Sequence, residues 1–291
     1  MTRAVLVAVR GVLLAAMVAG CTGATKTSSS AASQSAGHDA PMPADLEQQV
    51  ARSSEIGRQL YVLDKVSSIA TDAVLAEISD ADSRNLGGYI PLQEGGANGQ
   101  PTQSFLVTFF TRDVPPRVAY EVVIAPDAKP KLEAFSPPKG MPAPLALLVR
   151  ARQLAIGALG QPAQPVNPVV LPGEAIGERG IAVYLLAGTS RAHVAVLGKH
   201  SRALVSEDGA RVLQLTALSK TVLEIPTQDP AGGRVAALTV THVVTDFPLE
   251  THVFASLAAG LPIYVGTRRG VWRVDGDRIA FLGPLAPPKL Q

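Results

Sequence analysis

Four of the five histidines lie between positions 193 and 252, and they form the densest group of potential metal ligands in the chain. They are His193, His200, His242 and His252. Neutral imidazoles combined with a carboxylate are the ligand set that zinc uses in hydrolytic sites. Asp246 and Glu250 stand between the last two histidines and could supply that carboxylate. One interpretation is therefore a zinc site in which His242 and His252 are ligands and His193 or His200 completes the set.

Structural roles explain the same residues, and we favour them. His242 shares one face of a predicted strand with apolar residues, which is typical of the edge of a core. Asp246 is placed to cap the next helix through its carboxylate, and Glu250 would stabilise the first turn through the helix dipole. His193 and His200 are an odd number of residues apart, so their side chains are expected on opposite faces unless a turn intervenes. We therefore expect no cofactor, with zinc as the alternative.

The order of predicted elements after Glu178 gives a second indication of metal chemistry. Glu178 precedes a strand, His242 closes a strand, residues 248–252 open a helix, and residues 264–267 begin a strand pair. This order resembles the JAB/MPN (JAMM) family of metal-dependent hydrolases. The resemblance implies a site built from Glu178, His242, Glu250 and His252.

The chain departs from the metal motif of that family at three positions. Val240 stands where the family has its first histidine, Leu249 where it has serine, and His252 where it has aspartate. His242 and Glu178 match the motif. The resemblance therefore implies a shared fold in which metal binding is lost or rewired.

Two pairs of neighbouring polar residues are weaker candidates. Arg268 and Arg269 lie in a predicted turn beside Trp272, where arginines can bind phosphate or carboxylate. The alternative is a solvated turn that supports a hairpin. Ser219 and Lys220 are adjacent, so on a strand their side chains diverge and do not form a serine–lysine dyad. We interpret that pair as a polar strand end.

Cys21 is the only cysteine in the chain. It follows the small residues 18–20 at the end of an apolar stretch that begins near Gly11, with Arg3 and Arg10 upstream. A basic segment, a short apolar segment and small residues before a cut are typical of a secretory signal. With the cysteine at the cut, the segment resembles the lipobox of bacterial lipoproteins. The resemblance implies cleavage before Cys21 and attachment of fatty acyl chains such as palmitate to its thiol.

The expected anchor places the protein in the cell envelope, with the membrane as a partner through Cys21. Two or three acyl chains hold a protein firmly, whereas one chain binds marginally. In Gram-negative lipoproteins, an aspartate after the cysteine favours the inner membrane. Thr22 stands there instead, so we expect the periplasmic face of the outer membrane if the cell has two membranes.

Composition limits the possible partners. The chain has 26 basic and 24 acidic residues, and removing Arg3 and Arg10 with the signal leaves 24 of each sign. A body without net charge has no field that attracts nucleic acid, so we expect none as a partner. Aromatic residues make up 4% of the chain, which argues against a stacking platform for carbohydrate.

We divide the chain into four parts. Residues 1–20 are the predicted signal peptide, and residues 21–43 are the lipidated cysteine and a flexible linker rich in small and polar residues. Residues 44–160 are expected to form an N-terminal α+β lobe, and residues 161–291 a strand-rich C-terminal lobe. Prolines 162, 165 and 168 mark the boundary.

Residues 44–79 contain no proline and repeat apolar residues at helical spacing. The apolar positions are Leu46, Val50, Leu60, Leu63, Val66, Ala70, Val74 and Ile78. We expect one long amphipathic helix, broken near Gly57. Packing on the protein's own sheet is favoured over a coiled-coil partner, because the stripe drifts from a strict heptad.

The rest of the chain predicts an α+β fold with antiparallel sheets flanked by helices. Residues 80–103 are expected to form loops around the apolar stretch 89–92, and helices are expected at 142–159 and 248–259. Short β-branched segments predict strands at 105–111, 118–124, 131–135, 181–186, 193–197, 202–206, 211–216, 235–244, 263–267, 271–274 and 278–281.

The favoured function is that of a lipid-anchored envelope protein whose body binds an envelope component or protein partner, or has a structural role, without catalysis. A metal-dependent hydrolase of altered JAMM type is one alternative. The other is capture of a small ligand in a periplasmic cleft near residues 160–172.

Overall fold

The computed structural model describes residues 39–95, 101–162, 165–189, 191–228 and 235–285. The predicted signal peptide, Cys21 and linker residues 22–38 lie outside these ranges. The helices are α1 (Glu47–Glu77), α2 (Asp80–Arg84), α3 (Ala143–Leu159) and α4 (Glu250–Ala259), with the short 3-10 helix η1 (Gly173–Ile176). None of the helices in these ranges combines the length and the apolar content needed to cross a bilayer.

The described strands form three four-stranded sheets and one two-stranded sheet. The first sheet has the order β1–β2–β3–β4, the second β5–β6–β8–β9 and the third β11–β12–β13–β14, while β7 pairs with β10. Pairing is antiparallel except between β11 and β12, which are parallel. The strands are β1 (Leu86–Gly95), β2 (Pro101–Thr111), β3 (Val118–Ile124), β4 (Lys131–Lys139), β5 (Val166–Pro172), β6 (Ile181–Ala187), β7 (Val194–Gly198), β8 (Ser201–Val205), β9 (Val212–Ala217), β10 (Val222–Pro226), β11 (Leu238–Thr241), β12 (Ile263–Gly266), β13 (Val271–Asp275) and β14 (Arg278–Gly283). The predicted α+β class is confirmed.

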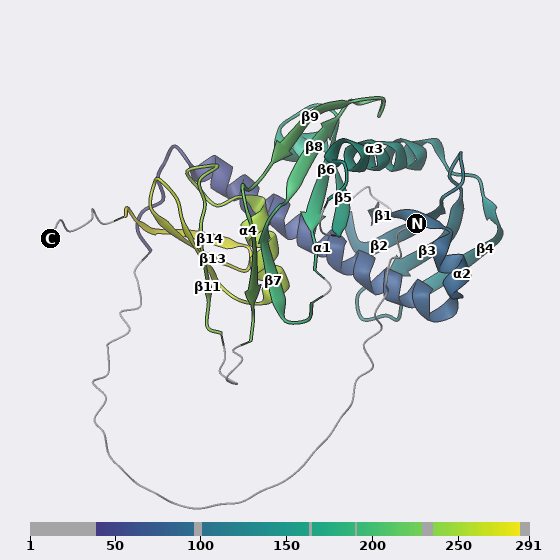
Figure 1. The fold of residues 1–291 in the computed structure, drawn as a ribbon, viewed down its shortest axis with the longest axis horizontal. Helices are drawn as coiled ribbons and strands as arrows, with labels where there is room; N and C mark the ends of the chain where they lie inside the picture. The colour runs from purple at the N-terminus through teal and green to yellow at the C-terminus, as the bar shows by residue number, and fades with distance from the viewer. Residues whose placement is uncertain (1–38, 96–100, 163–164, 190, 229–234, 286–291) are drawn as a thin grey trace, which may run out of the picture. The chain divides into compact units, whose positions relative to one another are not determined.

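Helix α1 links the sheets. Its C-terminal part packs against β1, β2 and β3, and its N-terminal part packs against α4 and β14 (Figure 1). The predicted apolar stripe from Leu60 to Val74 is buried in one core cluster with β2, β3, β5 and β6. The stripe therefore packs on the protein's own sheets, which is the interpretation favoured over a coiled-coil partner.

The predicted break at Gly57 is wrong, because α1 is continuous over 31 residues. Gly57 lies where α1 crosses α4, and a Cβ atom added there would be 2.4 Å from the Cβ of Val253. It would also be 2.6 Å from the carbonyl oxygen of Glu250. The glycine therefore allows two helices to approach closely and does not interrupt the helix.

The prediction of loops over residues 80–103 is wrong for most of that segment. Residues 86–95 form β1, which pairs along its length with β2, and residues 80–84 form α2. Gly87 and Gly88 lie within β1, and a residue with a side chain would not fit at either position. A Cβ on Gly87 would be 2.6 Å from the carbonyl oxygen of Thr111, and one on Gly88 would be 2.6 Å from the Arg152 guanidinium.

Other predicted bounds shift in ways that the backbone explains. Pro168 belongs to β5 and not to a linker, and β5 is an edge strand, where a missing N–H is tolerated. Strand β4 continues to Lys139 past the expected end. β10 was not predicted, and only Leu238–Thr241 of the expected strand 235–244 is extended and paired.

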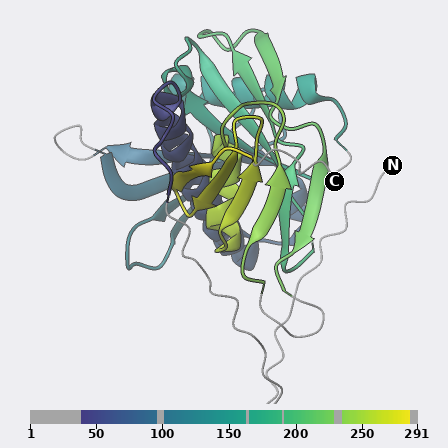
Figure 2. The same cartoon turned by 90° about the vertical axis from the view of Figure 1, so that its left-hand side faces the viewer.

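Two further cores complete the packing. One joins α3 to β1, β2 and the sheet that contains β5, β6 and β8. The other joins α4 to β7 and to the sheet that contains β12, β13 and β14. Figure 2 shows this last sheet in yellow, with α4 behind it. Trp272 is fully buried in that core.

The end of the predicted linker is held against the last sheet. The N–H of Ala40 donates to the carbonyl of Phe281 at 2.8 Å. The Asp39 carboxylate pairs with Arg278 at 2.7 Å and with Arg273 at 3.3 Å. Residues 39–43 are therefore fixed to β13 and β14 before α1 begins.

Candidate functional site

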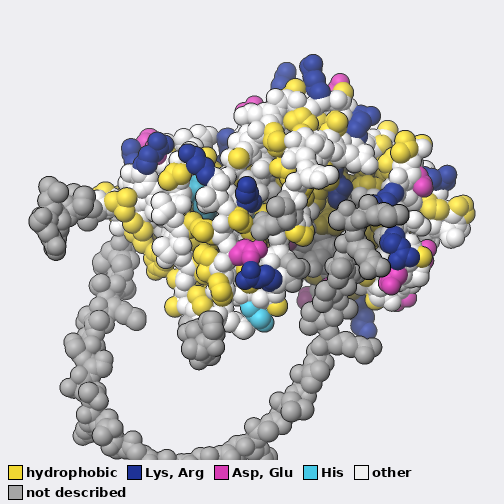
Figure 3. Space-filling model, in the orientation of Figure 1, with side chains coloured by type: hydrophobic (Ala, Val, Ile, Leu, Met, Phe, Trp, Pro, Cys, Tyr) yellow, Lys and Arg dark blue, Asp and Glu magenta, His cyan; other side chains and the backbone are white. Residues whose placement is uncertain are grey.

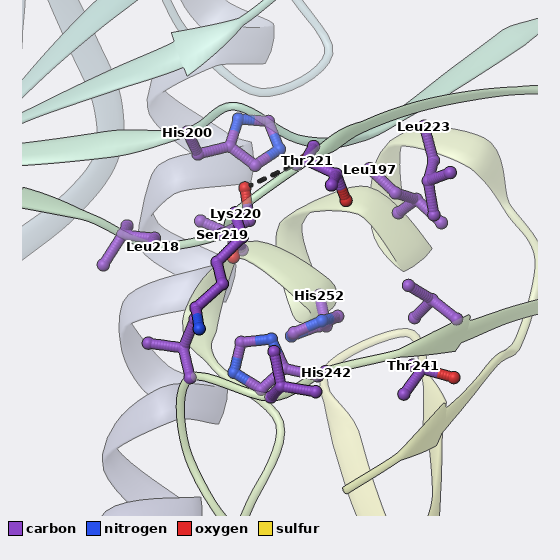
Figure 4. Close-up of a pocket in the computed structure, with 15 residues that line it drawn as sticks. Leu197, His200, Leu218, Ser219, Lys220, Thr221, Leu223, Thr241, His242 and His252 are labelled. Atoms are coloured by element: carbon purple, nitrogen blue, oxygen red, sulfur yellow. Dashed lines mark hydrogen bonds between the residues drawn. The ribbon is translucent and has the colours of Figure 1, made fainter.

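Three of the predicted histidines line one cavity of about 220 Å³. His200 lies in the tight connection between β7 and β8, His242 directly follows β11, and His252 lies in the first turn of α4. Figure 4 shows His200 on one side of the cavity and His242 with His252 on the other. All three side chains are buried, with exposed fractions of 2%, 4% and 7%.

His242 and His252 touch each other. Their ring centroids are 4.7 Å apart and the ring planes meet edge to face at 86°. They come close because β11 ends at Thr241 and the chain then turns through residues 242–249 into α4. The contact brings two imidazoles together that are ten positions apart in the sequence.

Backbone N–H groups determine the tautomers of His200 and His252. The N–H of Ala187 donates to Nδ1 of His200 at 3.0 Å, and the N–H of Leu249 donates to Nδ1 of His252 at 3.0 Å. A neutral imidazole that accepts at Nδ1 carries its proton on Nε2. We therefore assign an Nε2–H donor to both rings. The Nε2 atom of His200 is buried without a hydrogen-bond partner among the described residues.

His242 is held by a local network. Its Nε2 lies 2.9 Å from Oγ1 of Thr245, and that hydroxyl donates to the carbonyl of Phe247 at 2.6 Å. The backbone N–H of Thr245 donates to the same Nε2 atom at 3.3 Å.

Burial keeps all three imidazoles neutral. It lowers the pKa of His200 to about 4, against a smaller opposing effect from the backbone of Val196. Burial lowers the pKa of His242 to about 4. Burial, with a smaller contribution from neighbouring His242, lowers the pKa of His252 to about 3. At neutral pH the cavity therefore presents neutral hydrogen-bonding groups and not imidazolium ions.

These pKa values predict acid-sensitive stability. The three histidines take up protons near pH 6.5 when the chain unfolds, but only near pH 4 or below when it is folded. The free energy of unfolding should therefore be highest above about pH 7 and should fall as the pH drops from 6.5 towards 4. His200 alone contributes roughly 3 kcal/mol to this loss, at about 1.4 kcal/mol per unit of pKa. Urea unfolding at several pH values measures it.

His193 offers the matched control for this measurement. Its side chain is exposed and it does not line the histidine cavity. His193 has a φ of +56°, a backbone conformation that asparagine tolerates, so His193→Asn should leave the pH profile unchanged. A wild-type stability that is flat between pH 7 and pH 5 would contradict the predicted role of burial.

The geometry does not assemble the predicted zinc ligands. Within the described ranges, no three His, Cys, Asp or Glu side chains converge as a metal requires. Zinc needs a lone pair from each imidazole, whereas His200 and His252 use theirs to accept backbone N–H groups. Glu178 is exposed in the connection before β6, and His193 lines a different cavity.

The predicted capping role of Asp246 is wrong. Helix α4 begins at Glu250 after the N-cap residue Leu249, so Asp246 lies too far upstream. Its carboxylate instead accepts from Nε of Arg268 at 3.0 Å. The cap is made partly by His252, whose ring accepts the N–H of Leu249.

Glu250 occupies the first turn of α4 as predicted, but its carboxylate has a further role. The side chain is buried and accepts from the hydroxyl of Tyr184 at 2.7 Å and from Arg202 at 3.1 Å. Burial and the Glu250 carboxylate raise the pKa of Tyr184. The sequence analysis missed this group, although an arginine inside the apolar strand 201–205 was a signal that it needs a buried partner.

The predicted anion site at Arg268 and Arg269 is occupied by the protein's own carboxylates. Arg268 pairs with Asp246 at 3.0 Å, and Arg269 pairs with Asp45 at 2.7 Å. Ser219 and Lys220, interpreted as a polar strand end, belong to the lining of the histidine cavity.

A second cavity, of about 510 Å³, lies near the segment where a ligand cleft was expected. Asn167 of β5 lines it together with Asp64, His193 and Phe254. Nδ2 of Asn167 donates to Asp64 at 3.2 Å, so these polar groups satisfy each other. His200, which lines the histidine cavity, in contrast has an Nε2 atom without a partner among the described residues.

Comparison with known proteins adds no relative. No family model, no curated protein and no solved structure matches the chain. The site is therefore interpreted from its own geometry.

Proposed function

We propose that this chain is a lipid-anchored envelope protein that binds a small molecule in the histidine cavity without catalysing a reaction. The observation that carries the proposal is a cavity of about 220 Å³ in which three buried, neutral imidazoles stand among mainly apolar side chains.

The other lining residues support binding over catalysis. The cavity has apolar walls from Leu197, Leu218 and Leu223, with few polar groups, as small-molecule sites usually have. None of the described lining residues is Asp or Glu, so these residues do not supply the carboxylate that a zinc hydrolase or a general acid–base pair would use. Neutral imidazoles with fixed tautomers serve well as hydrogen-bonding groups.

A fragment screen tests the binding proposal. The full chain, kept unacylated by Cys21→Ala, is screened by ligand-observed NMR against fragments that carry a carbonyl or carboxylate. Val240→Phe places a larger side chain in the cavity wall and should abolish binding of most hits. Val114→Phe is the control, because Val114 is 97% exposed and lies outside the cavity. Hits that bind Val240→Phe and wild type equally would overturn the proposal.

The anchor is tested separately. Cys21→Ala should move the protein from the membrane fraction to the released fraction and abolish incorporation of labelled palmitate. The reason is that two or more acyl chains supply the hydrophobic binding that holds such a protein on a bilayer. A Cys21→Ala protein that still cofractionates with membranes would contradict anchoring through this residue.

A further inference from the structure

The described residues that line the histidine cavity supply N–H donors and one cation, and none of them is Asp or Glu. The imidazole donor available to a ligand is Nε2–H of His252, because that ring accepts a backbone N–H at Nδ1, whereas Nε2 of His200 is enclosed by protein atoms. Lys220 is the only charged side chain among the described lining residues. Figure 4 shows the Lys220 side chain extending from the β9–β10 connection towards His242. This combination selects for oxygen acceptors and for negative charge.

We propose that the cavity binds the carboxylate of a small apolar monoacid. The inference rests on the proposed function and deepens it by naming the ligand class. The carboxylate accepts from Nε2–H of His252 and pairs with the ammonium group of Lys220, while the apolar part lies against the leucine and valine walls. Such charge-assisted hydrogen bonds are roughly twice as strong as neutral ones.

The charges of the lining side chains argue against protonated amines and phosphates as ligands. A protonated amine would lose its hydration without a carboxylate partner, which is costly. A phosphate dianion would meet only one positive charge, because burial keeps the imidazoles neutral at pH 7. One cation therefore matches one negative charge.

The volume of the cavity and its lining side chains limit the apolar part of the ligand. The cavity of about 220 Å³ is smaller than the roughly 300–1,000 Å³ typical of sites for drug-sized ligands. Its apolar lining side chains are Leu197, Leu218, Leu223, Val240, Val243 and Val244. A short branched or monocyclic acid suits these walls better than a polar acid does. On the face drawn in Figure 3, acidic and basic side chains are scattered in small groups.

The test compares acids with their own amides. Butanoate, 4-methylpentanoate and benzoate, each with the matching amide, are titrated calorimetrically into the unacylated full chain at pH 7. The amide keeps the shape and one acceptor oxygen of the acid but lacks its negative charge and its second acceptor oxygen, so the difference in affinity reports the carboxylate. We expect at least one acid to bind about tenfold or more tighter than its amide. Lys220→Met should reduce the affinity for that acid to the level of the amide and leave the amide unchanged.

Controls separate the possible outcomes. Lys131→Met replaces an exposed lysine in another sheet and should change neither affinity. Lys220 is itself exposed, so its substitution is expected to leave the fold intact. Amides that bind as tightly as acids, or fragments that bind while no acid does, would overturn the carboxylate inference alone. If, in addition, Val240→Phe fails to affect any bound fragment, the proposed function fails as well.

Discussion

Arg202→Met is expected to lower the free energy of unfolding by about 3–5 kcal/mol, the range for removing one partner of a buried ion pair. The Glu250 side chain is only 4% exposed and lies 3.1 Å from Arg202. Without the guanidinium, its charge would remain buried beside the hydroxyl of Tyr184, which does not balance a negative charge. Urea unfolding at pH 7 measures the loss.

Two controls identify the cause. Arg58→Met breaks an ion pair with Glu55 in which both side chains are about half exposed, so it should cost less than about 1 kcal/mol. Adding Glu250→Gln to Arg202→Met removes the uncompensated charge and keeps an acceptor for Tyr184. The double variant should recover more than half of the loss. Equal losses for Arg202→Met and Arg58→Met would show that the buried pair has no special role.

Gly57→Ala should destabilise the protein by about 1–3 kcal/mol, the usual cost of inserting a methyl group into a packed core. The added Cβ would lie 2.4 Å from Cβ of Val253 and 2.6 Å from the carbonyl oxygen of Glu250. One of these contacts is with backbone, so a rotamer change cannot relieve it. Helices α1 and α4 must therefore move apart, and thermal or urea unfolding measures the effect.

Gly157→Ala is the matched control, because Gly157 also lies inside a helix but has no atom within 4 Å of the added Cβ. There the exchange should stabilise the protein by about 0.5–1 kcal/mol through helix propensity alone. The two variants should thus shift stability in opposite directions. If Gly57→Ala also stabilised the protein, the crossing would be looser than the distances indicate.

The fold class and several elements followed from local pattern. The apolar stripe from Leu60 to Val74 predicted a buried face of α1, and β-branched alternation predicted β3 with the bounds that the structure has. Gly160 ends α3 as expected. These predictions succeeded because the spacing of apolar residues records which face of an element is buried.

The errors at glycine and proline share one cause. Local flexibility of glycine predicts a break at Gly57 and loops in the segment that contains Gly87 and Gly88, whereas each of these glycines makes room for a distant segment. Pro168 was assigned to a linker because the sequence does not state that β5 is an edge strand. The local propensity of glycine and proline is weak beside the packing that surrounds them.

The candidate site also combines features that the sequence determines with features that only the tertiary structure determines. The clustering of histidines in the chain and the neutral charge balance came from the sequence by itself, because residue type and order determine them, and lipid attachment at Cys21 stays a prediction from the sequence. Only the tertiary structure decided that His200, His242 and His252 share a cavity with Lys220 while Glu178 and His193 do not. It also decided that backbone N–H groups turn two of these imidazoles into donors. The physical reason is that burial and hydrogen-bond partners, which determine the chemistry of a histidine, come from strands and helices far apart in the chain.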